Sequence, residues 1–352
     1  VAPGTLLRSE PFTRAVPPGA RAWRILYATT RGDGSPAVAS GVVMTAAATD
    51  AKPRPVIAWS HGTTGLARGC APSLFPDPFL NVPAVRQLLA ENWVYVATDY
   101  VGLGAPGSHA YLVGEEAARA VLDSVRAARQ IDGLALDNRV VVWGHSQGGN
   151  SALWVGQSAA GYATDVNLLG VAALAPASDL PTLLQSAQRT MFGKIVSAYL
   201  AEAYLEAYPD LDAGSYLQPS ARLLAGDIAR RCVGGRETLL SVAETLLLPR
   251  DGIFRRPPGE GAFGERLAEN TPRAPIPVPL LIAQGEADDL VLARTQGDYV
   301  ASRCAAGQAI DYRTYAARDH ISVLAADSLL TSDLIAWTRD RLAGIPAVST
   351  CP

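Results

Sequence analysis

The sequence is poor in lysine, cysteine and histidine. Only two of its 352 residues are lysines, Lys52 and Lys194, and four are cysteines and four histidines. Lysine and arginine together number 30 against 33 acidic residues, which leaves a net charge of −3. No cluster of basic residues is dense enough to neutralise a run of phosphates, so we expect no nucleic-acid partner.

Long apolar runs are also missing. No stretch approaches the roughly 18 to 20 apolar residues that span a bilayer, so we expect no transmembrane segment. The chain starts at Val1 without a charged and then apolar leader. This predicts that a signal peptide is absent from the sequence or has already been removed. The length suits one domain that carries an insertion, and we expect a monomer.

The cysteines are Cys70, Cys232, Cys304 and Cys351, and no C-x-x-C pair occurs among them. This spacing argues against a zinc ribbon, and we expect no metal site. The alternatives are four buried thiols and two disulfides. The even number, the position of Cys351 and the scarcity of lysine favour disulfides in a secreted protein. Four cysteines permit three pairings, and the spacing does not choose among them.

Short apolar runs alternate with helical patterns along most of the chain. This alternation predicts an α/β fold with a mostly parallel sheet covered by helices on both faces. The first two strands are expected to pair through the Gly32-Asp33-Gly34 turn. The expected strands are 23–29, 38–45, 56–60, 93–98, 139–143, 170–174, 279–284 and 309–315. The expected helices are 82–92, 111–130 and 147–160, with a further helix after each of the last two strands.

The alternation stops at about residue 179 and resumes after residue 271. We therefore divide the chain into a first core segment (1–178), a helical insertion (179–271) and a second core segment (272–352). The insertion has apolar stripes at 192–205 and 239–248, which are either plain core or a cap over a site. Four prolines between 272 and 279 predict a stiff extended connector back to the sheet.

The strongest functional signal is Gly144-His145-Ser146-Gln147-Gly148, which lies between an expected strand and a helix of small residues. A serine on such a sharp turn has strained backbone angles, and its neighbours two positions away must lack side chains. The strain holds the hydroxyl out of the sheet above a helix N-terminus. We interpret Ser146 as a nucleophile, and the alternative is a glycine-rich turn with an idle serine.

A serine nucleophile needs a base, and a third group must orient that base. His61 and His109 precede the turn, and His145 lies inside it. Only His320 follows the last expected strand, as the chain order Ser, Asp, His requires.

The acid is expected in the loop at 285–291, where Asp288 fits a G-x-x-D-x-x-V pattern with Val291 packed inward. Glu286 and Asp289 in the same loop are the alternatives, which would otherwise be solvated charges.

Acyl transfer also needs preorganised N–H donors for a developing oxyanion. The amide of Gln147 directly follows the nucleophile and is one candidate. The second is expected from the loop His61-Gly62-Thr63-Thr64-Gly65, after the strand at 56–60. Either Thr63 or Thr64 could present its amide, and a threonine hydroxyl could add a third donor.

These residues together resemble the secretory lipase family of α/β-hydrolases. The likeness extends over most of the chain, and the elbow alone would not be specific. It rests on the elbow and His320, and on Ser60-His61-Gly62-Thr63-Thr64-Gly65, Cys70-Ala71-Pro72-Ser73, Asp99-Tyr100-Val101-Gly102-Leu103-Gly104, Leu122-Asp123-Ser124-Val125-Arg126-Ala127 and Asp288-Asp289-Leu290-Val291. One departure is the oxyanion loop, where the fungal pattern has an acidic residue and this chain has Thr or Gly.

The resemblance implies an α/β-hydrolase fold with an inserted helical cap, and a secreted lipase or esterase with the triad Ser146, Asp288 and His320. It also implies two disulfides, which fall on Cys70–Cys232 and Cys304–Cys351. The expected substrate is a fatty acyl ester such as an acylglycerol, cleaved through an acyl-enzyme without any cofactor. The protein would contact a lipid interface only transiently.

Four alternatives stay open at this point. The same scaffold supports a deacetylase or esterase of small soluble esters, a peptidase and an acyltransferase. The last alternative is an inactive hydrolase fold that serves as a binding module.

Overall fold

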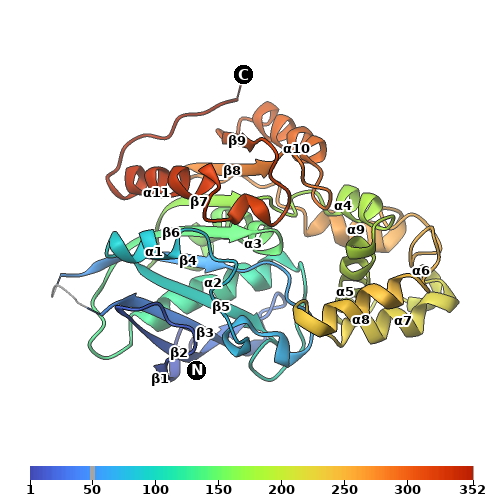
Figure 1. Ribbon diagram of the computed structural model, residues 1–352, viewed down its shortest axis with the longest axis horizontal. Coiled ribbons are helices and arrows are strands. Elements are labelled where there is room, and N and C mark those ends of the chain that lie inside the picture. The colour runs from blue at the N-terminus through green and yellow to red at the C-terminus, as the bar shows by residue number, and fades with distance from the viewer. Residues whose placement is uncertain (48–51, 352) are drawn as a thin grey trace.

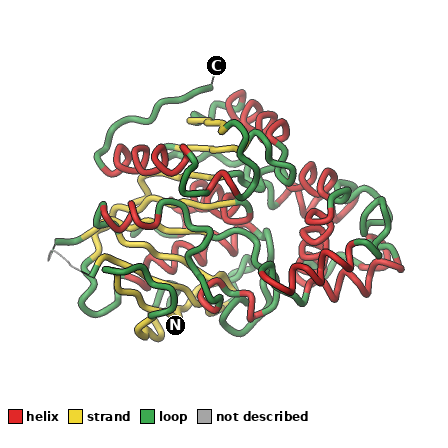
Figure 2. The backbone as a smooth tube through the Cα atoms, viewed as in Figure 1, coloured by secondary structure: helices red, strands yellow, loops and turns green. Residues whose placement is uncertain are grey.

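The computed structural model describes residues 1–47 and 52–351, and within them nine strands form one sheet (Figure 1, Figure 2). The strand order is β1-β2-β3-β5-β4-β6-β7-β8-β9. From β5 to β9 neighbouring strands are parallel, whereas β1, β2 and β3 add an antiparallel edge to β5. The strands are β1 (Leu6–Phe12), β2 (Ala20–Thr30), β3 (Pro36–Ala46), β4 (Arg54–Ser60), β5 (Val94–Val101), β6 (Leu136–His145), β7 (Asn167–Leu174), β8 (Leu280–Gly285) and β9 (Asp311–Tyr315).

Helices cover both faces of this sheet. One face carries α2, α3 and α10, and the other carries α1 and α11 (Figure 1). The bounds of these helices are α1 (Val85–Ala90), α2 (Gly114–Ala128), α3 (Gln147–Tyr162), α10 (Ala293–Ala305) and α11 (Leu329–Leu342). Three single 3-10 turns complete this part of the chain, at Arg68–Cys70, Pro72–Leu74 and Ser322–Leu324.

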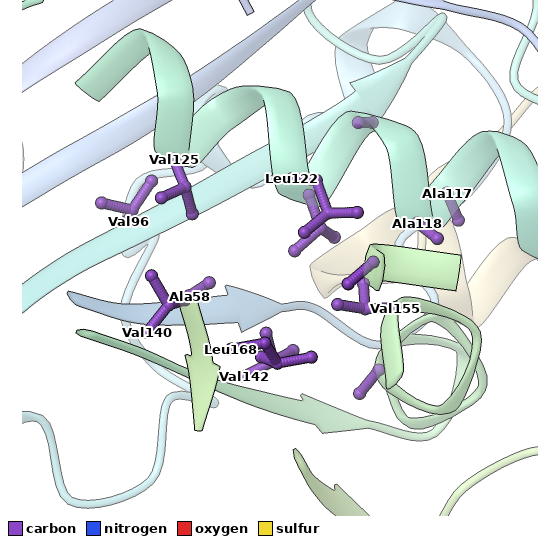
Figure 3. Packing of buried hydrophobic residues seen from close by; sticks show 14 of the residues in the cluster. Ala58, Val96, Ala117, Ala118, Leu122, Val125, Val140, Val142, Val155 and Leu168 are labelled. Carbon is purple, nitrogen blue, oxygen red and sulfur yellow. The ribbon is translucent and has the colours of Figure 1, made fainter. Parts of the chain in front are cut away.

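The central strands are apolar on both sides because both faces of the sheet are covered. In β6, Val140 and Val142 belong to the apolar cluster with α2 and α3, whereas Val141 and Trp143 belong to the cluster with α11. Figure 3 shows the first cluster, with Val140 and Val142 below α2. Because β6 is packed on both faces, the position of the loop that follows it is fixed at the edge of the sheet.

The predicted α/β-hydrolase fold is confirmed, and every expected strand is present. Strand β1 was not expected, since Leu6–Phe12 is an edge strand with several exposed residues and no clear apolar alternation. Helix α1 is shorter than the predicted helix at 82–92.

Between β7 and β8 the chain forms six helices within the described residues. These are α4 (Leu180–Ala187), α5 (Met191–Ala207), α6 (Ala213–Tyr216), α7 (Pro219–Ala229), α8 (Gly235–Thr245) and α9 (Gly261–Glu269). Figure 1 shows them gathered beyond the carboxyl ends of the parallel strands. They enclose a separate apolar cluster, to which Tyr111, Leu290 and Val291 of the sheet domain contribute.

The two apolar stripes of this insertion differ in burial. Along α5, Ile195, Tyr199 and Tyr204 are fully buried, so most of that stripe is plain core. The leucines of α8 and of the turn after it are largely exposed, except Leu248. None of the described helices combines the length and apolar character that a bilayer-spanning helix needs.

Two disulfide bonds connect distant parts of the chain. Cys70 is bonded to Cys232 and joins the loop after β4 to the α7–α8 connection. Cys304 is bonded to Cys351 and ties the C-terminal segment to the end of α10. The structure thus links the expected pairs, and the first bond attaches the insertion to the sheet domain.

Candidate active site

Ser146 lies on the sharp turn between β6 and α3, at the carboxyl edge of the sheet. Its backbone angles are φ 57° and ψ −116°, a strained conformation for a residue with a side chain. The Ser146 N–H donates to the carbonyl of Leu174 at 3.0 Å, and its own carbonyl accepts from Asn150 and Ala177. These bonds anchor the turn to the end of β7 and to the first turn of α3.

The flanking glycines are required by close backbone contacts. A Cβ at Gly144 would lie 2.0 Å from the carbonyl oxygen of Gly148, across the turn. A Cβ at Gly148 would lie 1.9 Å from the carbonyl oxygen of Ser60, at the end of β4. The two glycines therefore let α3 start directly against the neighbouring strand and hold Ser146 at the edge.

His320 follows β9 and lies against the serine. Its Nε2 is 2.8 Å from Ser146 Oγ, and its Nδ1 is 2.7 Å from Asp288 Oδ2. A carboxylate only accepts hydrogen bonds, so Nδ1 carries the proton and Nε2 is free to accept from the serine hydroxyl. All three side chains are buried. The arrangement can remove a proton from Ser146.

Asp288 is held in one orientation by the loop after β8. Its Oδ1 accepts the amides of Leu290 at 3.0 Å and Val291 at 2.8 Å. Its Oδ2 accepts from Gln284 Nε2 at 3.0 Å, in addition to His320. The alternative acids are placed elsewhere, because Glu286 and Asp289 are exposed to solvent.

The other three histidines are buried and serve different contacts. His145 donates from Nε2 to the carbonyl of His320 at 2.8 Å, and burial lowers the pKa of His145 to about 3. His109 bonds to the carbonyl of Val101, and burial likewise lowers its pKa to about 3. Burial also lowers the pKa of His61. Neutral imidazoles therefore surround the site at neutral pH.

The two segments expected to supply oxyanion donors both lie next to Ser146. Gln147 is the first residue of α3, where the backbone N–H groups have no acceptor within the helix. The loop with Thr63 and Thr64 lies close to the elbow, since a Cβ at Gly62 would be 3.6 Å from Ser146 Cβ. Thr63 Oγ1 is 2.6 Å from the hydroxyl of Tyr111.

A cavity of about 260 Å³, called here the serine cavity, opens onto Ser146. Thr63, Thr64 and His320 also line it. Its apolar lining comes from both the sheet domain and the insertion: Trp59, Phe75, Leu80, Val82, Phe192, Val233 and Ile321. Of the α5 stripe, only Phe192 lines it.

A larger cavity of about 780 Å³ lies elsewhere at the edge of the insertion and does not include Ser146. Its lining carries several carboxylates, including Glu115, Glu206 and Glu269. His109 borders this second cavity as well.

Some site residues were missed from the sequence. Gln284, the last but one residue of β8, carries the amide that bonds Asp288. A polar residue in an otherwise apolar strand next to the acid loop was the available signal. The contact between Gln147 and His109, at 2.9 Å, had no signal because 38 residues separate them.

Comparisons with known proteins agree with this architecture. A family model described as secretory lipase matches residues 80–350. A probable inactive lipase of Mycobacterium tuberculosis is 25% identical and aligns with 98% of this chain and 79% of its own length. Lipase A of Arthroderma benhamiae is 26% identical, with 99% and 78% covered.

Two solved structures share the fold. Candida antarctica lipase A superposes with a TM-score of 0.81 at 19% identity, over 100% of this chain and 84% of that one. The rice cell wall degrading esterase LipA of Xanthomonas oryzae gives a TM-score of 0.76 at 24% identity, over 98% and 100%.

Proposed function

The chain belongs to the secretory lipase family, and from this premise we propose that it is a carboxylic ester hydrolase that works through an acyl-enzyme on Ser146. One observation carries the proposal: the continuous hydrogen-bond path from Ser146 Oγ to His320 at 2.8 Å and on to Asp288 at 2.7 Å. Nucleophile, base and orienting acid are thus in contact without any rearrangement.

The proposed reaction has two steps. His320 Nε2 takes the proton of Ser146 while Oγ attacks the ester carbonyl, and the imidazolium then gives this proton to the leaving alcohol. Water attacks the acyl-enzyme by the same route, His320 acting again as base, and the acid is released. The amide of Gln147 and one amide of the Thr63–Thr64 pair hold the negative oxygen in both tetrahedral intermediates. Side chains, amides and water carry every step.

A fatty acyl ester, such as an acylglycerol, is the substrate that fits best. The serine cavity has aromatic and aliphatic walls, and Asp77 is the only carboxylate among the described residues that line it. The larger cavity suits an acyl chain poorly. A bound acyl chain would desolvate the carboxylates that line this cavity, and these carboxylates would repel the acid product. A deacetylase of small soluble esters is the second candidate, supported by the modest volume of the serine cavity.

We place the lipid contact on the outer face of α8. Four leucines on α8 and in the turn directly after it are exposed by more than half: Leu239 (70%), Leu240 (56%), Leu246 (73%) and Leu247 (73%). The inner face is polar, with Ser241 and Thr245 buried and Glu244 paired with Arg231 at 2.7 Å. A helix with its apolar side toward water needs another apolar phase to cover it.

The position of this face favours a lipid surface as the occupant. Val233 and Gly234 line the serine cavity and lead directly into α8. Leu80 and Ile321 line the same cavity and are themselves exposed. A lipid surface on α8 would therefore also meet the entrance to Ser146.

We further propose that helices α4 to α9 form a cap over the site, corresponding to the expected insertion at 179–271. Support comes from Phe192 and Val233, which this segment contributes to the serine cavity. The two disulfides and the family favour an extracellular location.

The decisive test is Ser146→Ala, assayed with p-nitrophenyl esters. Hydrolysis should fall to the background rate. The melting temperature should change little, because the substitution removes only one buried hydroxyl. A retained rate would refute the mechanism.

Relative rates on triacylglycerol emulsion, short soluble esters and peptide amides would then identify the substrate class. Added methanol would reveal an acyltransferase by its ester product. One relative is named a probable inactive lipase. If the unmodified protein hydrolysed none of these substrates, a binding module would be favoured instead.

A further inference from the structure

The side chain of Gln147 makes a contact that the reaction itself does not explain. Gln147 is 2% exposed, and its Nε2 lies 2.9 Å from Nε2 of His109. His109 Nδ1 is 3.0 Å from the carbonyl of Val101, which can only accept, so Nδ1 carries the ring proton. Nε2 of His109 is then an acceptor, and the Gln147 amide donates to it.

This bond persists over a wide pH range. Burial lowers the pKa of His109 to about 3, so the ring stays neutral and keeps its acceptor at neutral and mildly acidic pH. The glutamine side chain is therefore tied at its far end, while its backbone N–H is the first amide of α3.

The His109 ring also belongs to a buried aromatic group. It stacks on Tyr100 with ring centres 5.6 Å apart and planes 16° apart. Tyr100 in turn contacts the ring of His61 at 4.5 Å, and its hydroxyl donates to the His61 carbonyl at 3.2 Å. His61 begins the loop that contains Thr63. The same stack thus contacts both segments that are expected to supply oxyanion donors.

A second contact closes this group. The rings of Tyr111 and His109 meet edge to face with their centres 6.2 Å apart, and the Tyr111 hydroxyl is 2.6 Å from Thr63 Oγ1. His61, Tyr100, His109 and Tyr111 are all buried. A displacement of the His109 ring would therefore alter contacts of both segments that are expected to supply oxyanion donors.

We propose that His109 is a positioning residue: through the Gln147 side chain it holds the Gln147 backbone amide in the orientation that binds the oxyanion. The inference rests on the acyl-enzyme mechanism proposed above. An oxyanion donor must lie about 2.7–3.1 Å from the position that the negative oxygen will occupy. Loss of one such donor lowers kcat by about 10² to 10³. Loosening one donor should have a smaller effect, about 10- to 100-fold.

The test replaces the imidazole by an aromatic ring without nitrogen, which removes the acceptor for Gln147 together with the donor to the Val101 carbonyl. In His109→Phe the stack on Tyr100 is retained, and the neighbouring cavity of about 780 Å³ leaves room for the slightly larger ring. We expect kcat for a soluble ester to fall about 10- to 100-fold with KM within about threefold, because the oxyanion exists only in the transition state. Titration of the reactive serine with a phosphonate counts the competent active sites, so that kcat can be expressed per active molecule.

The partner variant is Gln147→Met, which removes the donor and keeps the backbone amide. It should reproduce the loss of kcat, and His109→Phe should have no further effect when combined with it. Tyr27→Phe is the matched control, since the Tyr27 hydroxyl makes a buried bond to the carbonyl of Ala120 at 2.9 Å. This control should lower the melting temperature and leave kcat unchanged.

A folded His109→Phe protein with kcat within twofold of the unmodified enzyme would overturn the inference, as would losses that multiply in the double variant. If His109→Phe does not fold, Gln147→Met alone tests the same bond by the same split of kcat and KM. Ser146→Ala, measured in parallel, separates the two proposals. Its retained activity would refute the mechanism, whereas an inert Ser146→Ala with an unaffected His109→Phe would refute only the role of His109.

Discussion

At the scale of single residues, the site depends on a carboxylate that faces donors on both of its oxygens. Oδ1 of Asp288 meets the backbone amides of Leu290 and Val291, and Oδ2 meets the imidazole of His320 and the amide of Gln284. An isosteric amide cannot satisfy this environment in either orientation, because its NH2 group would always face a donor.

Asp288→Asn should therefore lower kcat by about four orders of magnitude, the effect of an orienting carboxylate replaced by its amide. The amide NH2 favours the His320 tautomer that has its proton on Nε2, which cannot accept from Ser146. KM for a soluble ester should change little. Initial rates at saturating p-nitrophenyl ester measure the effect.

Asp289→Asn is the matched control, one position along the same loop but exposed to solvent. Its activity should stay within twofold of the unmodified enzyme. A comparable loss in both variants would mean that the charge of the loop, and not the bond to His320, supports the reaction.

The residues that chain order can locate were found from the sequence. Ser146, Asp288 and His320 were each chosen by their place after a strand, and the structure brings all three into hydrogen-bond contact. Gln147 was chosen in the same way, but its partner His109 could not be. That contact depends on how a loop after β5 folds back over α3, which no local pattern encodes.

At the scale of elements, the buried parallel strands were the most predictable part. Their continuous apolar runs reflect cover on both faces, and this pattern is strong in short segments. Strand β1 is partly exposed at the edge of the sheet, so its sequence shows little of that pattern. Helix α8 could not be assigned in this way, since its apolar pattern left plain core and a cap as alternatives, and its leucines lie in solvent.

The outward leucines of α8 and of the turn after it lead to a prediction about lipid interfaces. Replacing Leu239, Leu240, Leu246 and Leu247 by glutamine should reduce hydrolysis of a triacylglycerol emulsion about tenfold or more. Full burial of one leucine contributes about 1.5–3 kcal/mol, and 1.4 kcal/mol is a tenfold change in binding. Rates on a short soluble ester should stay unchanged, because these side chains do not line the serine cavity.

The control for this experiment is Leu329→Gln on α11, since Leu329 is also 73% exposed but lies on a helix remote from α8 (Figure 1). It should leave both rates unchanged. Equal emulsion rates for the α8 variant and the unmodified enzyme would exclude a lipid contact at this face. A change from dimer to monomer in sedimentation would instead identify the occupant as a second copy of the chain.

At the scale of the whole molecule, folding buries three histidines in neutral form. Burial lowers the pKa of His61, His109 and His145, to about 3 for the last two. In the unfolded chain each would titrate near 6.5. Between these values the unfolded state binds more protons than the folded state, so acid favours unfolding.

The free energy of unfolding should therefore fall as the pH drops from about 6.5, and the fall should continue toward pH 3. Each neutral histidine contributes up to about 1.4 kcal/mol per pH unit, and the three together up to about 4 kcal/mol per unit. Buried Glu116 opposes this trend, because burial raises its pKa and the folded state then takes up its proton first. Urea unfolding at intervals between pH 7.5 and 4.5 measures the slope, and a flat profile would show that the folded protein protonates these rings. Above about pH 7.5 all three are neutral in both states, so any further change there must come from other groups.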